Sequence, residues 1–297
     1  MRWNFKKDFF RGFGSVRKDR DLFVRKKDAA EVLFCGTFDK SDIQPRIAHV
    51  HSLIKSVRRF DLPFLAERGI PITATFGTYT TACSEYVIWA ALTLMRNFYS
   101  LQNRKIQSYS CWSHNSRSEE LSNKTVVLFG GNGEIGTRLK EMLPSLGMNP
   151  LVVDRDDSFD KAVEYIHRSK VVVSLLPSTK DTLGFFGHRI FSYFDGQFYI
   201  DVGRGGVCDL GALYAAIMQN KVSAAALDVF EAEPPDYSHP IFSHPDVVYT
   251  PHIAGVSGEW EYRTGIVAGF VVQHLEDKQL RDAFAIQDAG MGYTRIT

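Results

Sequence analysis

Short apolar runs rich in β-branched residues alternate with longer mixed stretches through the second half of the chain. We expect strands in the apolar runs and helices between them. Strands that are apolar on both faces and alternate with helices are typical of a parallel sheet buried on both sides. The pattern therefore predicts a doubly wound α/β domain that binds ligands beyond the carboxyl ends of its strands. The predicted strands are 125–130, 150–154, 170–176, 197–203, 224–230 and 247–250.

The first hundred residues also alternate apolar runs with polar stretches. Strands are predicted to begin at Ala30, near His49 and at Pro71. A helix is predicted over 81–98, where Thr81 can cap the first turn. This helix is apolar almost all round, so we expect it to be buried. The pattern indicates a second α/β domain, and the polar stretch after the helix suits a connection between the two domains.

Composition argues against several classes of protein. A hydrophobic content of 44% and a charged content of 23% are ordinary for a globular protein. The formal net charge of +1 gives no field that would favour nucleic acid or an anionic membrane as a partner. No apolar stretch reaches the roughly 20 residues of a membrane span, and we expect no secretory signal. The cysteines are scattered without metal-binding spacing, so we expect reduced thiols, no metal and a cytoplasmic location.

A glycine-rich segment directly follows the strand predicted over 125–130 and opens a helix. Gly131, Gly133 and Gly136 have the spacing G-x-G-x-x-G, which indicates a dinucleotide site in this context. We expect Gly131 to permit the tight turn, Gly133 to let a pyrophosphate approach, and Gly136 to let the helix pack closely. The N–H groups at the start of the helix would then face the phosphates. The alternative is a glycine turn without a ligand.

The next predicted strand ends in an acid. Asp154 lies about 20 residues beyond the glycines, where a carboxylate can accept hydrogen bonds from ribose hydroxyls. The same carboxylate would repel a 2′-phosphate, so this position favours NAD. Arg155 is adjacent and could bind a phosphate, which keeps NADP as the less favoured alternative.

Three further strand ends carry groups capable of chemistry. They are Arg204 after one strand, Asp228, Glu231 and Glu233 after the next, and His252 after the last. Parallel strands end at one edge of the sheet, so these groups can converge on the nicotinamide end of a bound NAD. An arginine that binds a carboxylate, and a histidine that exchanges a proton with an acid bonded to its other nitrogen, suit the reduction of a 2-oxo acid.

Each of these groups also has a plain structural interpretation. Arg204 could form surface ion pairs with Asp201 or Asp209, and the acids could belong to a solvated loop. A lone histidine at a strand end most often bonds a neighbouring carbonyl. The occurrence of all three groups on neighbouring strands, beside a nucleotide motif, favours the functional interpretation.

From about Gly69 to Gly255 the chain resembles the D-isomer-specific 2-hydroxyacid dehydrogenases. The segments that carry the resemblance are GIPITATFGTYTTACSEYVIWAALTLMR, ELSNKTVVLFGGNGEIG, VVVSLLPSTKDT, YIDVGRGGVCDLGALYAAI, AAALDVFEAEPP and HPIFSHPDVVYTPHIAG. The resemblance implies that Arg204 binds the substrate carboxylate, and that His252 is the catalytic acid/base with Glu233 as its partner. Glu233 is chosen because the family's acid directly precedes a proline.

The resemblance also implies two domains with the active site between them. We expect a Rossmann-like doubly wound parallel sheet at 99–267. A smaller, flavodoxin-like α/β substrate domain would comprise 1–98 and 268–297, because the family's last helix packs back on the first domain. Family members are usually homodimers joined through the cofactor domain, and we expect the same here. The residues expected to bind the cofactor are Gly131, Gly133, Glu134, Ile135, Asp154, Arg155, Pro177, Val202, Gly203, Asp228, His252 and Gly255.

The substrate loop departs from the family pattern. The family's first domain carries a glycine-containing loop whose backbone meets the substrate carboxylate. Here that region reads KSVRRFDL without a glycine, so Ser56, Val57 and Arg58 are the expected substrate contacts. Arg58 or Arg59 could bind a second acidic group, or could form surface pairs with nearby acids such as Asp61.

Two other features are atypical for the family. Asp201 stands where the family usually has an asparagine. Residues 2–27 are rich in lysine and arginine, which could attract an anionic ligand, although a solvated surface is the simpler interpretation. Neither feature changes the expected reaction.

The resemblance and the residues together imply an NAD-dependent oxidoreductase that acts on a small D-2-hydroxy acid or 2-oxo acid. The alternative is an NAD(H)-sensing protein without significant turnover. The same family contains transcriptional corepressors that keep the fold and these residues.

Overall fold

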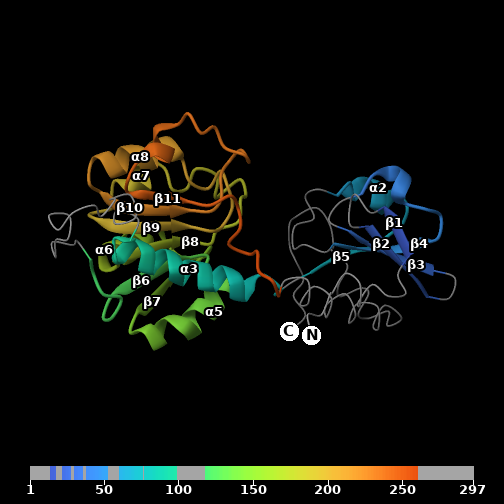
Figure 1. Cartoon of the computed structure of the whole chain (residues 1–297), viewed down its shortest axis with the longest axis horizontal. Coiled ribbons are helices and arrows are strands. Elements are labelled where there is room, and N and C mark those ends of the chain that lie inside the picture. The colour runs from blue at the N-terminus through green and yellow to red at the C-terminus, as the bar shows by residue number, and fades with distance from the viewer. Residues whose placement is uncertain are drawn as a thin grey trace, which may run out of the picture. The chain divides into compact units, whose positions relative to one another are not determined.

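The computed structural model describes residues 14–17, 22–27, 30–35, 38–52, 60–75, 77–98 and 118–259 (Figure 1). The chain divides into two compact units, of which the second runs from Tyr79 to Val256. The described residues before Tyr79 belong to the first unit. Within the described ranges, no helix is long and apolar enough to cross a membrane.

The second unit is built on a six-stranded parallel sheet with the strand order β11-β10-β9-β8-β6-β7. Its strands are β6 (Thr125–Phe129), β7 (Asn149–Val153), β8 (Val171–Ser174), β9 (Gln197–Asp201), β10 (Val222–Leu227) and β11 (Val247–Tyr249). After β7 the chain crosses back over β6 to form β8, so the carboxyl end of β6 is a topological switch point, where such sheets bind ligands. The predicted doubly wound, Rossmann-like α/β fold is confirmed.

Helices cover both faces of this sheet. On one face lie α3 (Thr80–Met95) and α5 (Glu134–Met142), and on the other lie α6 (Phe159–Arg168), α7 (His188–Phe191) and α8 (Leu210–Met218). The side chains of β6 alternate between two buried clusters, one for each face of the sheet. Two short 3₁₀ helices complete the unit: η3 (Leu143–Leu146) and η4 (Pro240–Ser243).

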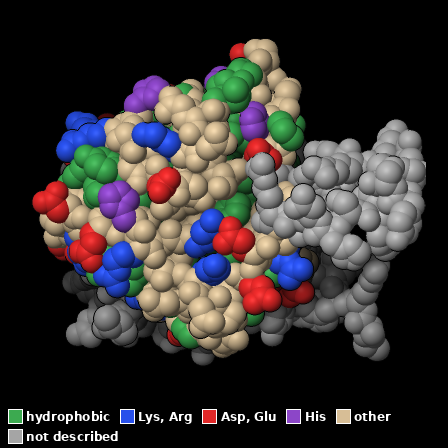
Figure 2. Space-filling model, turned by 90° about the vertical axis from the view of Figure 1, so that its left-hand side faces the viewer, with side chains coloured by type: hydrophobic (Ala, Val, Ile, Leu, Met, Phe, Trp, Pro, Cys, Tyr) green, Lys and Arg blue, Asp and Glu red, His purple; other side chains and the backbone are tan. Residues whose placement is uncertain are grey.

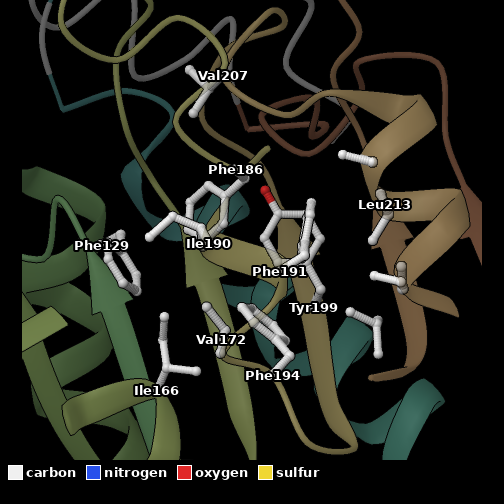
Figure 3. Packing of buried hydrophobic residues seen from close by; sticks show 14 of the residues in the cluster. Phe129, Ile166, Val172, Phe186, Ile190, Phe191, Phe194, Tyr199, Val207 and Leu213 are labelled. Carbon is white, nitrogen blue, oxygen red and sulfur yellow. The ribbon is translucent and has the colours of Figure 1, made fainter. Parts of the chain in front are cut away.

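Aromatic rings fill the core beneath α7 and α8 (Figure 3). The rings of Phe186, Phe191 and Phe194 surround Tyr199, with centroid distances of 4.9, 5.4 and 6.4 Å. Such tilted and edge-on contacts stabilise a core beyond the area that they bury. Tyr199 is fully buried on β9, so its hydroxyl must find a partner inside the protein.

The helix that we expected at the end of the substrate domain packs in the second unit. The buried face of α3 includes Val87, Ala90 and Leu94, which join the core over the six-stranded sheet. Its apolar side chains find their partners there, and the division between the units therefore falls before α3, at Thr78 and Tyr79, rather than after residue 98.

Two details of the prediction for α3 are wrong. The helix begins at Thr80 with Tyr79 at the N-cap position, and no side chain caps it, so Thr81 lies inside the first turn. The helix is also not buried all round, because Trp89 and Leu92 are 43% and 41% exposed. An apolar composition therefore did not show which side of the helix is covered.

The first unit contains a five-stranded sheet with the order β1-β2-β3-β4-β5. Its elements are β1 (Gly14–Arg17), β2 (Leu22–Lys27), β3 (Ala30–Cys35), η1 (Lys40–Asp42), β4 (Ile47–Ser52), α2 (Leu62–Glu67) and β5 (Ile72–Ala74). The strands β3, β4 and β5 are parallel, as an α/β domain requires, whereas β1 and β2 pair antiparallel. The connections before and after β2 are too short for a crossover, so these neighbours must be antiparallel. We predicted neither strand, because basic residues interrupt their apolar pattern.

One face of β4 carries a buried chain of polar side chains. The Thr75 hydroxyl donates to the Ser52 carbonyl at 3.0 Å, so Nε2 of His51 must carry the proton shared with Thr75 Oγ1 at 2.9 Å. Nδ1 of His51 then accepts from the Thr73 hydroxyl at 2.7 Å, and that hydroxyl accepts from Nε2 of His49 at 2.8 Å. Burial, and after it the neighbouring His49, lowers the pKa of His51 to about 3. This series of hydrogen bonds therefore requires an uncharged His51, with a proton on Nε2 and none on Nδ1.

The face of the second unit drawn in Figure 2 carries charges of both signs. Lysine and arginine side chains are interspersed there with aspartate and glutamate. Local ion pairs along the helices of this unit include Arg138 with Glu141 and Arg168 with Glu164. The face drawn thus has no single-sign patch of the kind that binds nucleic acid.

Candidate active site

A turn of glycines joins β6 to α5 at the switch point. We expected Gly131 to permit the tight turn. The left-handed residue of the turn is instead Gly130, which has a φ of 79°. A Cβ on Gly131 would lie 2.9 Å from the side chain of Val152, and one on Gly136 would lie 2.4 Å from the backbone of Gly131. The start of α5 therefore packs directly on the turn, and neither position has room for a side chain.

Gly133 differs from its neighbours because there is space in front of it. It is the N-cap residue of α5 with a φ of −72°, and the nearest atom to an added Cβ would be the Gly130 carbonyl oxygen at 3.4 Å. No side chain caps α5, so its first turn presents backbone N–H groups and a partial positive charge. Glu134 and Ile135 form the start of this turn. The arrangement fits the pyrophosphate of a dinucleotide.

Asp154 is fixed beside the same turn. It follows β7, and its Oδ2 accepts a hydrogen bond of 3.1 Å from the backbone N–H of Asn132. Its Oδ1 accepts from the backbone N–H of Arg155 at 2.8 Å, and the Arg155 residue itself is exposed. The carboxylate is thus anchored where a ribose would follow the pyrophosphate, which fits NAD.

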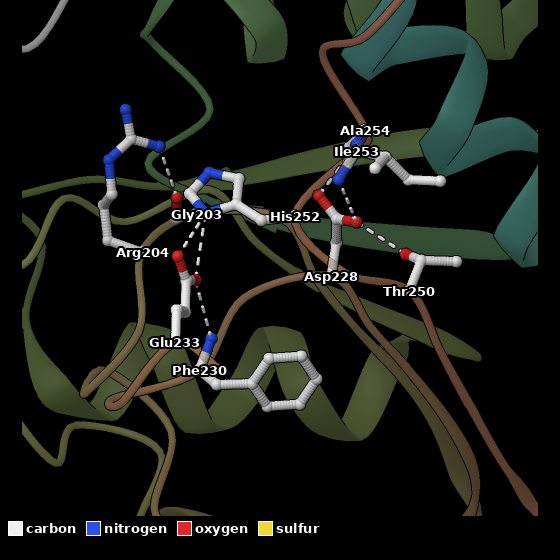
Figure 4. A network of polar contacts seen from close by, with 9 residues as sticks. All are labelled: Gly203, Arg204, Asp228, Phe230, Glu233, Thr250, His252, Ile253 and Ala254. Carbon is white, nitrogen blue, oxygen red and sulfur yellow. Dashed lines mark hydrogen bonds and ion pairs between the residues drawn. The ribbon is translucent and has the colours of Figure 1, made fainter. Parts of the chain in front are cut away.

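The imidazole of His252 is bonded to the carboxylate of Glu233 (Figure 4). Nδ1 lies 2.7 Å from Oε2 and 2.9 Å from Oε1, and Oε1 also accepts from the backbone N–H of Phe230 at 3.2 Å. The side chains of His252 and Glu233 are 44% and 38% exposed. Because the carboxylate is an acceptor, Nδ1 carries a proton, and Nε2 is the atom that can exchange a proton with a ligand.

A buried acid holds the backbone of His252 in an unusual conformation. His252 has a φ of 54°, a left-handed value that costs a residue other than glycine about 1 kcal/mol or more. Its N–H donates to the Asp228 carbonyl at 2.9 Å. The N–H groups of Ile253 and Ala254 each donate to an Asp228 carboxylate oxygen at 2.8 Å. Asp228 is only 1% exposed, so these charge-assisted bonds offset the strain and its own desolvation.

Two residues that we did not predict extend this anchor. The Thr250 hydroxyl donates to Oδ1 of Asp228, and the Tyr86 hydroxyl lies 2.6 Å from Thr250 Oγ1. Since Thr250 donates to Asp228, it must accept from Tyr86. Burial raises the pKa of Tyr86 to about 12, so the phenol stays a donor. Two features of the sequence could have indicated these residues: a threonine two positions before His252, and a lone tyrosine in an apolar helix.

The guanidinium of Arg204 lies in the loop after β9. Its Nη1 donates to the carbonyl of Gly203 at 2.7 Å (Figure 4). The next residue, Gly205, is pressed against the loop after β10, since a Cβ there would lie 1.7 Å from the Phe230 carbonyl oxygen. The loop that carries Arg204 and the loop that carries Glu233 are therefore in contact.

The structural alternatives for these side chains are not found. Among the described residues, no ion pair joins Arg204 to Asp201 or Asp209, and the Asp209 carboxylate instead caps α8 through the backbone of Ala212 at 3.0 Å. The acids after β10 are not one solvated loop, because Asp228 is buried. The carboxylate that reaches His252 is that of Glu233.

The remaining predicted cofactor residues have different surroundings. Pro177 is exposed in the loop after β8, and its carbonyl accepts from the Thr182 hydroxyl. The side chain of Val202 is 4% exposed and belongs to the core. Gly255 packs on a ring, since a Cβ there would lie 2.8 Å from Cδ1 of Tyr79. That Asp228 binds the cofactor stays a prediction, and its carboxylate holds the His252 loop.

The predicted substrate loop lies outside the described residues. This applies to Ser56, Val57, Arg58 and Arg59. Asp61, one of the acids with which the arginines could pair, is described. Its carboxylate caps α2 through the Phe64 N–H at 3.1 Å and lies 3.0 Å from Lys40 Nζ.

The family of the chain follows from comparison with known proteins. Residues 88–254, more than half of the chain, match the family model of the D-isomer specific 2-hydroxyacid dehydrogenase, NAD binding domain. The chain belongs to this family. The matched region contains the glycine turn, Arg204, Glu233 and His252, and NAD is the cofactor of this domain.

Individual relatives carry the names of enzymes for different substrates. The D-3-phosphoglycerate dehydrogenase of Archaeoglobus fulgidus is 30% identical over 239 residues, which are 76% of this chain and 45% of that protein. The glyoxylate reductase of Thermofilum pendens is 29% identical over 267 residues, or 82% of this chain and 77% of that protein. The chain thus spans less than half of the length of the first relative.

A solved structure gives the same result for the fold. The D-lactate dehydrogenase of Aquifex aeolicus, complexed with NAD and lactic acid, aligns with a TM-score of 0.70 at 23% identity. The alignment covers 87% of this chain and 86% of that one. At this identity the likeness concerns the fold alone.

Proposed function

We propose that this protein is an oxidoreductase that transfers a hydride between NAD(H) and a small D-2-hydroxy acid or 2-oxo acid. The observation that carries the proposal is the bond between His252 Nδ1 and the Glu233 carboxylate, at the carboxyl edge of an NAD-binding sheet. This arrangement leaves Nε2 as the exchangeable site of an acid/base catalyst.

His252 would act as the acid in the direction of reduction. NADH held by the glycine turn and Asp154 would supply the hydride to the carbonyl carbon. Nε2 of a protonated His252 donates its proton to the carbonyl oxygen, and the bond from Nδ1 to Glu233 keeps the ring oriented. In the reverse direction the neutral Nε2 accepts the proton of the hydroxyl group. Acid/base catalysis of this kind typically contributes about 10²- to 10⁴-fold.

Arg204 would bind the carboxylate of the substrate. A guanidinium offers two parallel N–H donors to a carboxylate, and each charge-assisted bond contributes about 1.5–3 kcal/mol net. The loop that carries Arg204 contacts the loop after β10, which carries Glu233. The positions of Arg204 and Glu233 therefore depend on each other. Ser56, Val57 and Arg58 remain our candidates for further substrate contacts, and the part of the chain that carries them remains the proposed substrate domain.

We also propose that the protein is a homodimer joined through the second unit. Trp89 and Leu92 are neighbours on one side of α3 and are 43% and 41% exposed. Interfaces between proteins are enriched in aromatic residues such as tryptophan, so these two side chains are candidates for the contact between two copies. Light scattering should give twice the mass of the chain, and Leu92→Glu should shift the mass toward the monomer.

The proposed reaction is tested with a panel of 2-oxo acids. The panel should include glyoxylate, hydroxypyruvate, pyruvate and a dicarboxylic 2-oxo acid, with NADH oxidation followed by absorbance. The proposal expects turnover with at least one of them. A protein that binds NADH but reduces none of the acids would instead fit the alternative of an NAD(H) sensor.

A further inference from the structure

A buried carboxyl lies beneath the loop that carries Arg204. Asp201 is the last residue of β9 and is only 1% exposed. Its Oδ1 accepts from the backbone N–H of Gly203 at 3.1 Å, and its Oδ2 accepts from the Tyr199 hydroxyl at 2.9 Å. Its backbone carbonyl accepts from the N–H of Asp228 at 3.0 Å. One residue therefore connects the β9 loop, the aromatic core and the end of β10.

We propose that Asp201 is a positioning residue for Arg204, an inference that rests on the proposed function. The connection runs through the Gly203 peptides. The Gly203 N–H is held by Asp201, and the Gly203 carbonyl holds Arg204 Nη1 at 2.7 Å (Figure 4). Gly203 packs against the backbone of Leu176, because a Cβ there would lie 2.5 Å from the Leu176 carbonyl oxygen. The Asp201 carboxylate thus sets the orientation from which the guanidinium reaches a substrate.

The surroundings of Asp201 make its charge depend on pH. Burial is the largest of the effects that raise the pKa of this carboxyl to about 6, and the neighbouring Asp228 adds to it. The Gly203 N–H and the Tyr199 hydroxyl act in the opposite direction by favouring the carboxylate. Burial raises the pKa values of Tyr199 and Cys208 well above their usual range, so both face Asp201 as neutral groups.

Protonation would weaken this connection. A neutral carboxyl gains an O–H that competes with the Tyr199 hydroxyl, which donates to Oδ2 of Asp201. It also turns a charge-assisted bond to Gly203 into an ordinary one, which is roughly half as strong. Arg204 is then held less firmly, and substrate affinity falls. The KM for the 2-oxo acid should therefore rise as the pH falls through about 6, with a smaller change in kcat.

Three variants separate this role from a general structural one. Asp201→Asn keeps an acceptor for Gly203 but cannot ionise, so its KM should be raised about 5- to 10-fold above pH 7 and should lack the step near pH 6. Tyr199→Phe removes a donor that favours the carboxylate, so the step should move to higher pH. The control is Asp209→Asn, where asparagine is an equally good helix cap and the step should stay in place.

A readout without substrate distinguishes this inference from the proposed function. The backbone amide of Gly203, observed by NMR, should titrate with a midpoint near pH 6 in the wild type and not in Asp201→Asn. If no 2-oxo acid is reduced, the proposed function fails, and a Gly203 titration that depends on Asp201 still supports the connection. An identical KM profile in the wild type and Asp201→Asn, or a Gly203 amide that does not titrate, overturns the inference.

Discussion

His252 and Glu233 are 19 residues apart in the sequence, and Nδ1 of the histidine lies 2.7 Å from Oε2 of the glutamate. They meet because β10 and β11 are adjacent parallel strands, so the loops that follow them leave the same edge of the sheet. A hydrogen bond between two half-exposed side chains contributes little to folding. Its position at the edge of an NAD-binding sheet is the basis of the acid/base role that we propose for His252.

Replacement of Glu233 should impair the reaction and leave the fold intact. Glu233→Gln removes the carboxylate that accepts from Nδ1 and orients the imidazole, so kcat should fall by about 10² or more while NADH affinity changes little. Steady-state kinetics and NADH fluorescence titration measure the two effects. Glu231→Gln is the matched control, since Glu231 is an exposed acid of the same loop, and it should retain the activity of the wild type.

The anchor of the His252 loop makes a separate prediction. Thr250→Val keeps the shape of the side chain but removes the hydroxyl that links Tyr86 to Asp228. The half-buried Tyr86 hydroxyl loses its partner, and the free energy of unfolding should fall by about 1–3 kcal/mol. Because the left-handed backbone of His252 depends on this anchor, kcat should fall as well.

Urea unfolding and steady-state kinetics test this prediction together. Thr137→Val is the control, because Thr137 is an exposed threonine on α5, and it should change both quantities only slightly. Loss of stability in Thr250→Val without any loss of kcat would show that Thr250 does not help to position His252.

Two glycines of the turn predict different effects, since a substitution at Gly133 should impair cofactor binding and one at Gly136 should impair folding. In Gly133→Ala the new Cβ meets no atom closer than 3.4 Å, so the thermal midpoint should stay within a few degrees of the wild type. The same methyl group occupies the space where a pyrophosphate would approach α5, so the Kd for NADH should rise by at least about 10-fold. In Gly136→Ala the Cβ would lie 2.4 Å from the Gly131 backbone, so the fold itself should be destabilised. Unchanged NADH binding in Gly133→Ala would contradict the proposed site.

The parts of the structure that depend on local pattern could be predicted from the sequence. Continuous β-branched runs predicted the parallel sheet, because a strand buried on both faces needs apolar side chains at every position. The family pattern, in which the acid before the proline serves, gave Glu233 rather than Glu231 as the neighbour of His252. The glycine spacing indicated where α5 packs on β6.

The parts of the structure that depend on tertiary contacts could not be predicted from the sequence. Nothing in the order of residues shows that His252 has a φ of 54°, and therefore that Asp228 must hold the backbone after it. The apolar composition of α3 did not show that Trp89 would be left exposed. The structural role of Thr250 was missed because a threonine is ordinary at the end of a strand.

The buried histidine of the first unit predicts loss of stability in acid. The pKa of His51 is lowered in the folded state to about 3, against 6.5 for an unperturbed histidine, so the unfolded chain binds more protons between these values. The contribution of His51 is therefore complete above about pH 6.5 and declines by about 1.4 kcal/mol for each pH unit below it.

Urea unfolding between pH 7 and pH 5 measures this decline. In His51→Gln, where nothing titrates at this position, the free energy of unfolding should fall less steeply over the same range. The control is His188→Gln, because His188 is exposed at the start of α7, and its slope should match that of the wild type. If the free energy of unfolding falls equally steeply with pH in all three proteins, the lowered pKa of His51 is not the cause of the decline.

The central claim is that His252 exchanges the proton during hydride transfer. The most direct test compares the wild type with His252→Gln in steady-state NADH oxidation with the best 2-oxo acid of the panel, alongside the Kd for NADH. We expect kcat to fall by at least about 10² while the Kd stays within about 3-fold of the wild type. A His252→Gln enzyme that turns over at the rate of the wild type would contradict the account.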